Sequence, residues 1–447
     1  MYIPIKERII IALDVPSLDE AVGWAGKLKP EVGIFKAGMQ LCNAAGTPNV
    51  LKAMKWIGVQ VFVDEKFHDI PNTVGQAAKT VSGLGATFFN VMASGGVDMM
   101  LAAEENKGDA KLLAVTVLTS REENEAHLSL GGPIKAKVLQ FAREGKLAGV
   151  DGYILSPQEV EFLQKRKELF LYYEPEFITP GVRPIGTAVN DQKRYDTAYR
   201  SVFLGATRIV VGRPVLKADD PLAVVRQLKE EIFKALRDRW LMSLFDAEKK
   251  HVKFGAFKLK LHELHPEAPL SPVYINMREM QQSIIDRMAE LMYEISMAQD
   301  LRYDYVIGIP KAGEPIAEAF CRLAGKPMLK MVKQEATAVG GRKITSTIIG
   351  KFEPGKKVLL IDDLITQADT KLEAFAGVEA NGLMAMDLLL GMDREQGGVE
   401  ILQDQGKNVY AVSKLKDSLN LFVREEKIDE AKKKEVIEYL DANRVTV

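Results

Sequence analysis

Short apolar runs rich in β-branched residues alternate with amphipathic segments through the first half of this sequence. The runs include IIIALDV (9–15), GIFKAG (33–38) and VQVFVDEKF (59–67), and helical spacing follows at 18–28 and 49–56. About eight or nine such units fit within roughly 220 residues, which is the size and rhythm of a (β/α)8 barrel. The sequence therefore predicts an α/β fold that begins with a TIM barrel.

The second half repeats this alternation, so the 447 residues are expected to form two domains. A single hydrophobic core seldom exceeds about 250–300 residues, and a helical run over 217–250 leads out of the barrel, which predicts domains at 1–235 and 236–447. The 60 basic residues nearly balance the 61 acidic ones, so neither nucleic acid nor a membrane is an expected partner. Two widely separated cysteines and the lack of an apolar leader favour a cytoplasmic protein.

The stretch VFVDEKFHDIPNT (61–73) carries three charges where an apolar run ends at a proline. Strand side chains alternate, so Asp64 and Lys66 should point to one side; Lys66 is predicted to end the strand and Asp69 to lie in the loop beyond. A charged strand exit in solvent is the simpler interpretation. Active sites of (β/α)8 barrels, however, gather at the C-terminal strand ends. For any single polar residue at a strand end, capping of the next helix is the simpler role. Only the recurrence of polar residues at many strand ends predicts a site. They are Asp14, Lys36, Asp64, Lys66, Ser94, Thr119, Ser120, Ser156, Gly181, Arg183, Gly212 and Arg213.

A series of motifs in fixed order gives the first half a family resemblance. They are ALD ending at Asp14, FKAG containing Lys36, DEKFHDIPNT, ASGG (93–96), LLAVTVLTS ending at Ser120, TPGVRP (179–184), DQKR (191–194) and VGRP (211–214). With these motifs, residues 7–230 closely resemble orotidine 5′-phosphate decarboxylase. The resemblance implies a TIM barrel that converts orotidine 5′-monophosphate (OMP) to uridine 5′-monophosphate (UMP) without a cofactor and without a metal in the barrel.

The chemistry of that reaction gives the charged residues their implied roles. Loss of CO2 from C6 of the pyrimidine leaves a carbanion that no carbonyl or cofactor delocalises, so the protein must stabilise it electrostatically. The family uses an alternating network that Lys36, Asp64, Lys66 and Asp69 match. The resemblance implies that Lys66 stabilises the developing charge and protonates C6, and that Asp64 faces the departing carboxylate. Asp69 resembles an aspartate that crosses from a partner subunit, which implies a homodimer or a larger homo-oligomer.

The resemblance also implies the substrate contacts. Asp14 and Thr73 match positions that touch the ribose, and Ser120 matches one that reads the pyrimidine edge. Pro180 belongs to the TPGVRP loop of the substrate site. The phosphate is expected at Gln192, Gly212 and Arg213, since barrels often bind phosphate after the last strands.

One rival group shares the D-x-K-x-x-D pattern on the same barrel. It comprises sugar-phosphate decarboxylases and aldolase-like synthases that use magnesium. Lys36, the pair Asn72 and Thr73, and the TPGVRP loop favour the orotidine enzyme. Met92 stands where many relatives have a histidine, and we interpret it as core packing.

The second half resembles orotate phosphoribosyltransferase, a type I phosphoribosyltransferase that makes OMP. The whole chain thus resembles a bifunctional UMP synthase in decarboxylase-first order, with orotate and phosphoribosyl pyrophosphate (PRPP) as further ligands and Mg²⁺ required only if the transferase domain is active. The strand VLLIDDLIT (358–366) delivers two carboxylates to its end, although capping of the next helix is the simpler alternative. The implied site residues are Asp362 and Asp363 for the ribose hydroxyls, Thr366 for phosphate, Arg394 for the orotate carboxylate, Lys260 and Tyr274 on the pyrophosphate and base sides, and Lys333 in a mobile loop.

Departures from that family pattern affect the phosphate-binding parts. Ala368 replaces a glycine of the phosphate cradle, Asp369 adds a negative charge there, and the mobile loop reads KQEAT (333–337), without two of its usual cations. Arg342 and Lys343 are candidate substitutes, and the spacing of His262 and His265 favours a surface loop over a metal site. We expect weak or lost transferase activity. A fully bifunctional synthase, and a domain kept for ligand sensing or assembly, are the alternatives.

Overall fold

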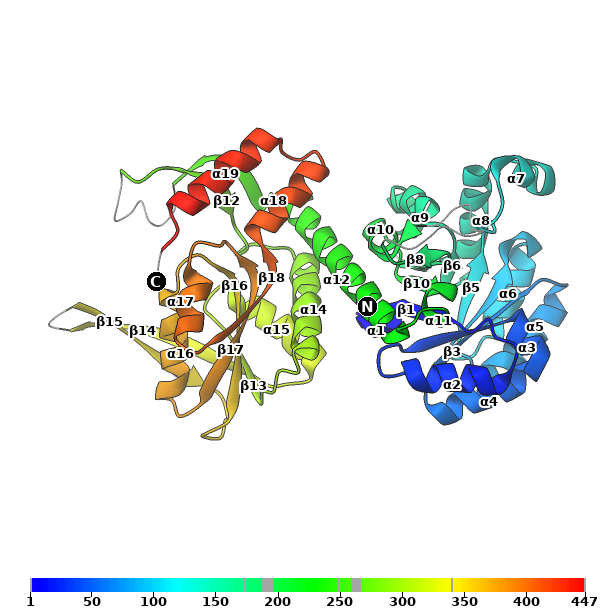
Figure 1. Cartoon of the computed structure of the whole chain (residues 1–447), viewed down its shortest axis with the longest axis horizontal. Helices are drawn as coiled ribbons and strands as arrows, with labels where there is room; N and C mark the ends of the chain where they lie inside the picture. The colour runs from blue at the N-terminus through cyan, green and yellow to red at the C-terminus, as the bar shows by residue number, and fades with distance from the viewer. Residues whose placement is uncertain are drawn as a thin grey trace. The chain divides into compact units, whose positions relative to one another are not determined.

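The computed structural model describes residues 2–171, 174–185, 196–247, 250–258, 267–338 and 341–445, with the backbone alone for 167, 333–338 and 341–345. The chain forms two compact units, Met1–Ala235 and Leu236–Val447. The boundary falls inside the long helix α12 (Pro221–Asp246). Figure 1 shows the first unit in blue to green and the second in green to red.

The first unit is a closed barrel of eight parallel strands, as predicted from the alternating pattern. Its order around the ring is β1-β10-β7-β6-β5-β4-β3-β2. Two further short strands, β8 (Val182–Arg183) and β9 (Asp196–Thr197), pair separately. The barrel strands are β1 (Ile9–Ala12), β2 (Ile34–Gly38), β3 (Gln60–Phe67), β4 (Phe88–Met92), β5 (Lys111–Val115), β6 (Gly152–Ile154), β7 (Glu176–Thr179) and β10 (Arg208–Val211).

Helices follow the strands, and local capping explains several of their starts. Ser17 caps α2, where its side chain accepts a hydrogen bond from Glu20 N at 3.3 Å, and Pro221 opens α12, so the run predicted over 217–250 is shorter than expected. The other helices are α1 (Ile5–Arg8), α2 (Leu18–Leu28), α3 (Met39–Ala45), α4 (Thr47–Ile57), α5 (Pro71–Gly83), η1 (Ala93–Gly95), α6 (Val97–Glu105), α7 (Glu123–Leu130), α8 (Ile134–Ala148), α9 (Pro157–Gln164), η2 (Lys167–Phe170), α10 (Ala198–Phe203) and α11 (Arg213–Leu216).

The barrel interior is filled by apolar side chains from every strand. Phe62 and Phe88 meet edge to face with ring centroids 6.2 Å apart. Met92 packs against this cluster, as predicted. The cluster comprises Ile10, Ala12, Ile34, Phe62, Phe88, Leu113, Val115, Ile154, Ile178 and Val210.

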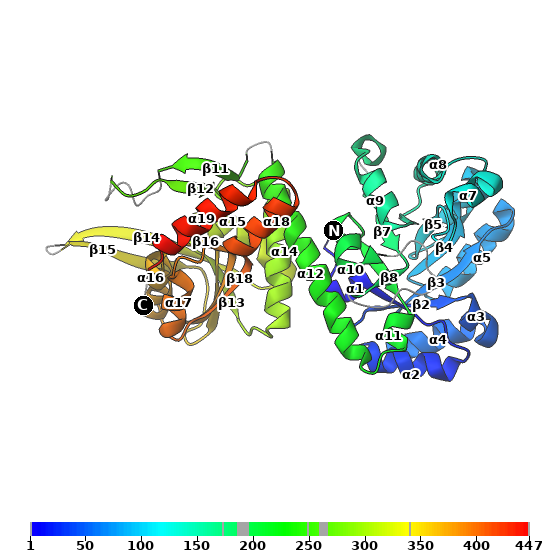
Figure 2. The ribbon, with the colours of Figure 1, turned by 45° about the horizontal axis from the view of Figure 1, so that its top comes forward.

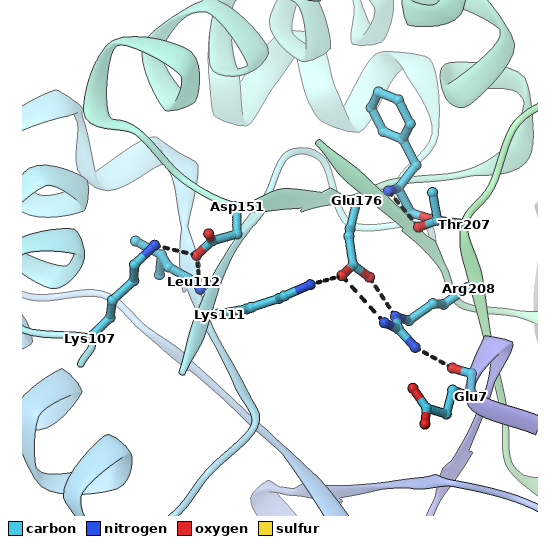
Figure 3. A network of polar contacts seen from close by, with 9 residues as sticks. Glu7, Lys107, Lys111, Leu112, Asp151, Glu176, Thr207 and Arg208 are labelled. Carbon is cyan, nitrogen blue, oxygen red and sulfur yellow. Dashed lines mark hydrogen bonds and ion pairs between the residues drawn. The ribbon is translucent and has the colours of Figure 1, made fainter. Parts of the chain in front are cut away.

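A network of ion pairs joins the N-terminal ends of three barrel strands (Figure 3). Glu176, the first residue of β7, lies between Lys111 of β5 and Arg208 of β10. Arg208 Nε donates to Glu176 Oε2 at 2.5 Å, and its Nη1 donates to the carbonyl of Glu7. Burial opposes ionisation of Glu176, but Arg208 and Lys111 outweigh it and hold the pKa of that carboxyl below its usual range. The network therefore joins three strands through paired charges.

The second unit is built on a six-stranded sheet in the order β15-β14-β13-β16-β17-β18. All neighbours are parallel except the hairpin β14–β15, which extends beyond the rest of this sheet in both views (Figures 1 and 2). The strands are β13 (Tyr305–Gly308), β14 (Met328–Ala338), β15 (Gly341–Ile349), β16 (Lys357–Ile365), β17 (Met384–Asp393) and β18 (Asn408–Lys414), with a separate pair β11 (Val252–Phe257) and β12 (Ser271–Ile275). The helices are α14 (Gln282–Ala298), α15 (Gly313–Ala324), α16 (Asp369–Ala380), α17 (Gly398–Asp404), α18 (Leu415–Arg424) and α19 (Glu430–Ala442).

The segment 333–337, predicted as a mobile loop, is part of strand β14 instead. Its backbone pairs antiparallel with β15, from Lys333 opposite Ser346 to Thr337 opposite Arg342. The β-branched residues of ITSTII (344–349) favour a strand on the opposite side of this hairpin. Among the described residues, no helix is both long and apolar enough to cross a membrane.

Candidate active site

The backbone of β3 departs from regular strand geometry at Lys66. Lys66 has φ +53°, a left-handed conformation that costs an ordinary residue about 1–2 kcal/mol. Pairing with β4 passes from Val63 and Phe89 to Phe67 and Val91, so four steps along β3 match two along β4. The strand continues to Phe67, which corrects the prediction that Lys66 ends it. The extra residues form a bulge that carries Asp64 and Lys66.

Four of the predicted charges form a continuous array at this bulge. Lys66 Nζ lies 2.6 Å from Asp64 Oδ1, and Lys36 Nζ lies 3.0 Å from Asp64 Oδ2. Lys36 Nζ also lies 3.1 Å from Asp14 Oδ1. Asp64 and Lys66 therefore do share a side, as predicted, whereas Lys36 stands in the middle of β2 and not at its end.

The inner members of the array are charged because each has a partner. Burial alone would lower the pKa of Lys36, but Asp64 and Asp14 outweigh it and raise that pKa. Burial likewise opposes ionisation of Asp64, yet Lys36 and Lys66 hold its pKa below the usual range. At neutral pH Lys36 is thus an ammonium and Asp64 a carboxylate.

Two residues of the site were missed in the sequence. Asn90 of β4 is fully buried; its Nδ2 donates to Asp64 Oδ1 at 2.7 Å and its Oδ1 accepts from Lys66 N at 2.8 Å. Gly38 leaves room for the array, since a Cβ there would lie 2.9 Å from Lys36 Nζ. The available signal for Asn90 was a lone polar residue inside the apolar run FFNVM (88–92).

A cavity of about 200 Å³ opens beside the array. Its charged side is formed by Lys36, Asp64 and Lys66, and the rest is largely apolar. The other lining residues are Phe62, Val115, Val117, Leu118, Thr119, Ile154, Pro180 and Val210. Such a site can hold a small, largely apolar group against the side chains of Lys36, Asp64 and Lys66.

The remaining predicted residues lie outside the lining of this cavity. Thr73 on α5, Ser120 in the loop after β5 and Arg213 at the start of α11 are exposed, and Gly212 is half-buried. The Asp69 carboxylate is exposed and accepts a hydrogen bond from Ile70 N at 2.7 Å. Within the part of the chain that the structure describes, Asp69 joins no ion pair with Lys66. Gln192 falls outside the described residues.

Comparisons with known proteins match the first unit of the chain. The profile of the orotidine 5′-phosphate decarboxylase / HUMPS family matches residues 7–228. An orotidine 5′-phosphate decarboxylase of Streptococcus pneumoniae is 41% identical over 232 residues, which are 51% of this chain and 97% of that protein. An orotidine 5′-phosphate decarboxylase of Streptococcus mutans is 40% identical over 232 residues, which are 51% of this chain and 98% of that protein. The chain belongs to the orotidine 5′-phosphate decarboxylase / HUMPS family.

This family relationship rests on the barrel alone. The solved structure of Leishmania donovani UMP synthase aligns with 98% of this chain and 97% of its own, at 21% identity and a TM-score of 0.48. A TM-score this low does not bear on the second unit. Its site residues must therefore be judged from their own geometry.

In the second unit, the paired aspartates lie within β16, two and three residues before its end, and a lysine of the next helix pairs with one of them. Lys371 Nζ lies 2.5 Å from Asp362 Oδ2, with both side chains at least 92% buried. Asp362 Oδ1 accepts from Asp363 N at 2.9 Å, so both oxygens of Asp362 are bonded within the chain. Burial, followed by the charge of Asp362, raises the pKa of Asp363 to about 7. Lys371 was not foreseen from the sequence.

The other residues predicted for the second unit are dispersed over several elements. Arg394 is 4% exposed, and its Nε and Nη2 have no hydrogen-bond partner among the described residues. Burial lowers the pKa of its guanidinium. Thr366 follows β16, and Tyr274 of β12 packs on Phe257 with ring centroids 5.6 Å apart. Lys260, His262, His265 and the side chains of Lys333, Arg342 and Lys343 lie outside the described residues.

Proposed function

We propose that the barrel decarboxylates OMP to UMP and is the last enzyme of pyrimidine nucleotide synthesis. The observation that carries the proposal is the Lys36, Asp64 and Lys66 array beside the cavity. The chain also spans 97% of a Streptococcus pneumoniae enzyme named for this activity. The free thiols Cys42 and Cys321 support a reducing, cytoplasmic location.

The array has the groups that this reaction needs. The bond between C6 and its carboxylate breaks, CO2 leaves, and the electron pair stays on C6. The ammonium of Lys66 stabilises that pair and then gives it a proton, and the resulting amine regains a proton from water. Asp64, held by two lysines, is the carboxylate against which the substrate carboxylate would rest.

Transition-state stabilisation must supply most of the rate. Two like charges about 4 Å apart repel by roughly 4 kcal/mol at an effective dielectric of 20. Enzymatic barrier lowering reaches about 23 kcal/mol for slow reactions. Repulsion by Asp64 alone is thus too small, and binding of the remote phosphate and the charge of Lys66 must contribute the larger share.

The predicted outer contacts complete the proposal. We propose that Arg213, which is exposed at the start of α11 after the last barrel strand, forms a bidentate pair with the substrate phosphate. Gln192 and Gly212 are proposed to assist it, with Asp14 and Thr73 at the ribose and Ser120 at the base. We propose that Asp69 reaches the array of a second copy, which makes the active form a homodimer or a larger homo-oligomer.

Steady-state turnover of OMP by the full-length protein tests this function. We expect conversion to UMP that is unchanged by EDTA, and a Lys66→Met variant that binds UMP but turns over far more slowly. Metal-dependent turnover of a sugar phosphate with no reaction of OMP would instead support the HUMPS side of the family. That outcome would overturn the proposal.

For the second unit we propose a type I phosphoribosyltransferase-like domain with weak or lost transferase activity. Besides the sequence departures at Ala368 and Asp369, both oxygens of Asp362 are bonded internally, which leaves fewer groups for a ribose diol. Nε and Nη2 of the buried Arg394 have no hydrogen-bond partner among the described residues, which supports retained binding of an anion such as orotate. Domains kept for ligand sensing or assembly are alternatives to catalysis.

Turnover of orotate with PRPP and Mg²⁺ by the same preparation tests the second proposal. We expect OMP decarboxylation without measurable formation of OMP from orotate. Isothermal titration with orotate alone then separates a sensing domain, which binds it, from an assembly domain, which does not. Transferase turnover comparable to decarboxylation would show a fully bifunctional synthase and refute the proposed impairment.

A further inference from the structure

Asn90 connects the two halves of the bulge that carries the catalytic array. It lies opposite the point where pairing between β3 and β4 breaks, between Val63 with Phe89 and Phe67 with Val91. Its amide accepts from Lys66 N at 2.8 Å and donates to Asp64 Oδ1 at 2.7 Å. The side chain thus supplies two bonds where the regular ladder is interrupted.

Each of these bonds constrains a different part of the array. The bond to Lys66 N holds a residue whose φ is +53°, a conformation that its own side chain disfavours. The bond to Asp64 Oδ1 shares that oxygen with Lys66 Nζ at 2.6 Å and fixes the plane of the carboxylate. Because the amide is neutral, it orients Asp64 without changing the charge balance of the two lysines.

Asn90 contacts the array from the protein interior and not from the cavity. It is fully buried and is not among the residues that line the cavity. A group that holds a catalytic side chain within a fraction of an ångström can affect the rate strongly, since misplacement by about 1 Å can cost roughly 100-fold.

We infer that Asn90 is a positioning residue of the decarboxylation: it holds Lys66 in the left-handed conformation that aims its ammonium at the reacting carbon, and it orients Asp64. This inference rests on the proposed function of the barrel. The simpler alternative is that Asn90 only satisfies buried polar groups of a bulge, in which case its loss would lower stability and leave the turnover of folded enzyme intact.

Three variants of the full-length protein separate these possibilities. Asn90→Leu removes both hydrogen bonds at similar volume. Asn90→Asp keeps an acceptor for Lys66 N but, when ionised, loses the donor to Asp64 and adds a like charge beside it. Thr116→Val is the matched control, because it removes a buried hydrogen bond, from Thr116 Oγ1 to Ile154 O at 3.2 Å, that does not touch the array.

The expected result is a split between kcat and KM. For N90L, kcat for OMP should fall about 100-fold, while KM and the affinity for UMP stay near wild type and T116V keeps its kcat. For N90D, kcat should rise as the pH is lowered, because the protonated carboxyl can again donate to Asp64, and wild type should lack this pH dependence.

The outcomes also distinguish a failure of this inference from a failure of the proposed decarboxylase function. Wild type that fails to decarboxylate OMP overturns the proposed function and the inference with it. Active wild type, with N90L and N90D equal to T116V in kcat per UMP-binding site and in pH profile, overturns the role of Asn90 alone. If N90L does not fold, the kcat and pH profile of N90D decide in the same way.

Discussion

Replacing Glu176 with glutamine removes the negative charge that pairs with Lys111 and Arg208 at the N-terminal end of the barrel. The size and shape of the side chain change little. Glu176 is 7% exposed and faces Arg208, which is 5% exposed, so E176Q leaves a buried guanidinium without its carboxylate. Removing one partner of a buried pair costs about 3–5 kcal/mol. The Lys111 side chain is 39% exposed and can be solvated instead. We therefore expect a loss of about 3 kcal/mol in the free energy of unfolding of the barrel.

Hydrogen exchange of the full-length protein measures this loss within the barrel. Peptides from β5, β7 and β10 should lose about 100-fold in protection, since each 1.4 kcal/mol is a factor of ten. Turnover of OMP should stay near wild type, because these charges lie at the strand ends away from the cavity. Glu161→Gln is the control: its partner Lys165 is 72% exposed, so the loss should be at most about 1 kcal/mol. Equal protection in the two variants would refute the reasoning.

The same variant has a defined pH dependence. Since the folded-state pKa of Glu176 is depressed below 4.5, its contribution is fully present above that pH and is lost as the pH falls through the folded-state value. The gap in stability between wild type and E176Q should therefore close on acidification. A gap that stays constant down to the acid transition would contradict the assigned charge state.

Three further predictions concern the two sites. Lys66→Met should lower kcat for OMP by about 1,000-fold or more, because it removes the proposed proton donor together with its positive charge, and unchanged UMP binding by titration would confirm a folded site. Gly38→Ala should lower kcat about tenfold, since the added Cβ would lie 2.9 Å from Lys36 Nζ and displace that ammonium; a kcat equal to wild type would show that the array adapts. Lys371→Met should destabilise the second unit by about 3 kcal/mol, because Asp362 loses its buried partner. Faster hydrogen exchange of the β16 amides, with unchanged decarboxylation of OMP, is the expected result.

The sequence predicted a barrel site from charges at strand ends, and the structure brings four of these charges together at or near strand ends. Asp14, Asp64 and Lys66 could be placed together because parallel strands bring their C-terminal ends to one face. Asn90 could not be assigned to the site, because its contacts depend on a bulge in β3 that no local sequence pattern predicts. The bulge is a tertiary property: it exists because β3 and β4 pair on both sides of it.

In the second unit, local motifs were a poorer guide. The segment 333–337 was predicted as a loop because it matches a mobile loop of the family that it resembles, yet pairing with a β-branched partner strand makes it part of β14. Lys371 escaped notice because its distance from Asp362 depends on how α16 leaves the end of β16. Phosphate-loop departures at Ala368 and Asp369 were visible in the sequence, but the internal bond to Asp362 was not.

The two ends of the barrel use the same residue types under different geometric conditions. At the N-terminal end, Glu176 lies between its cations and forms a buried pair with Arg208, so its expected role is to stabilise the fold. At the C-terminal end, Asp64 also lies between cations, but Lys66 has a left-handed backbone and its ammonium borders a cavity. A charge beside a cavity can act on a bound molecule. Substitution of Asn90 should therefore harm turnover more than folding, and substitution of Glu176 should harm folding more than turnover.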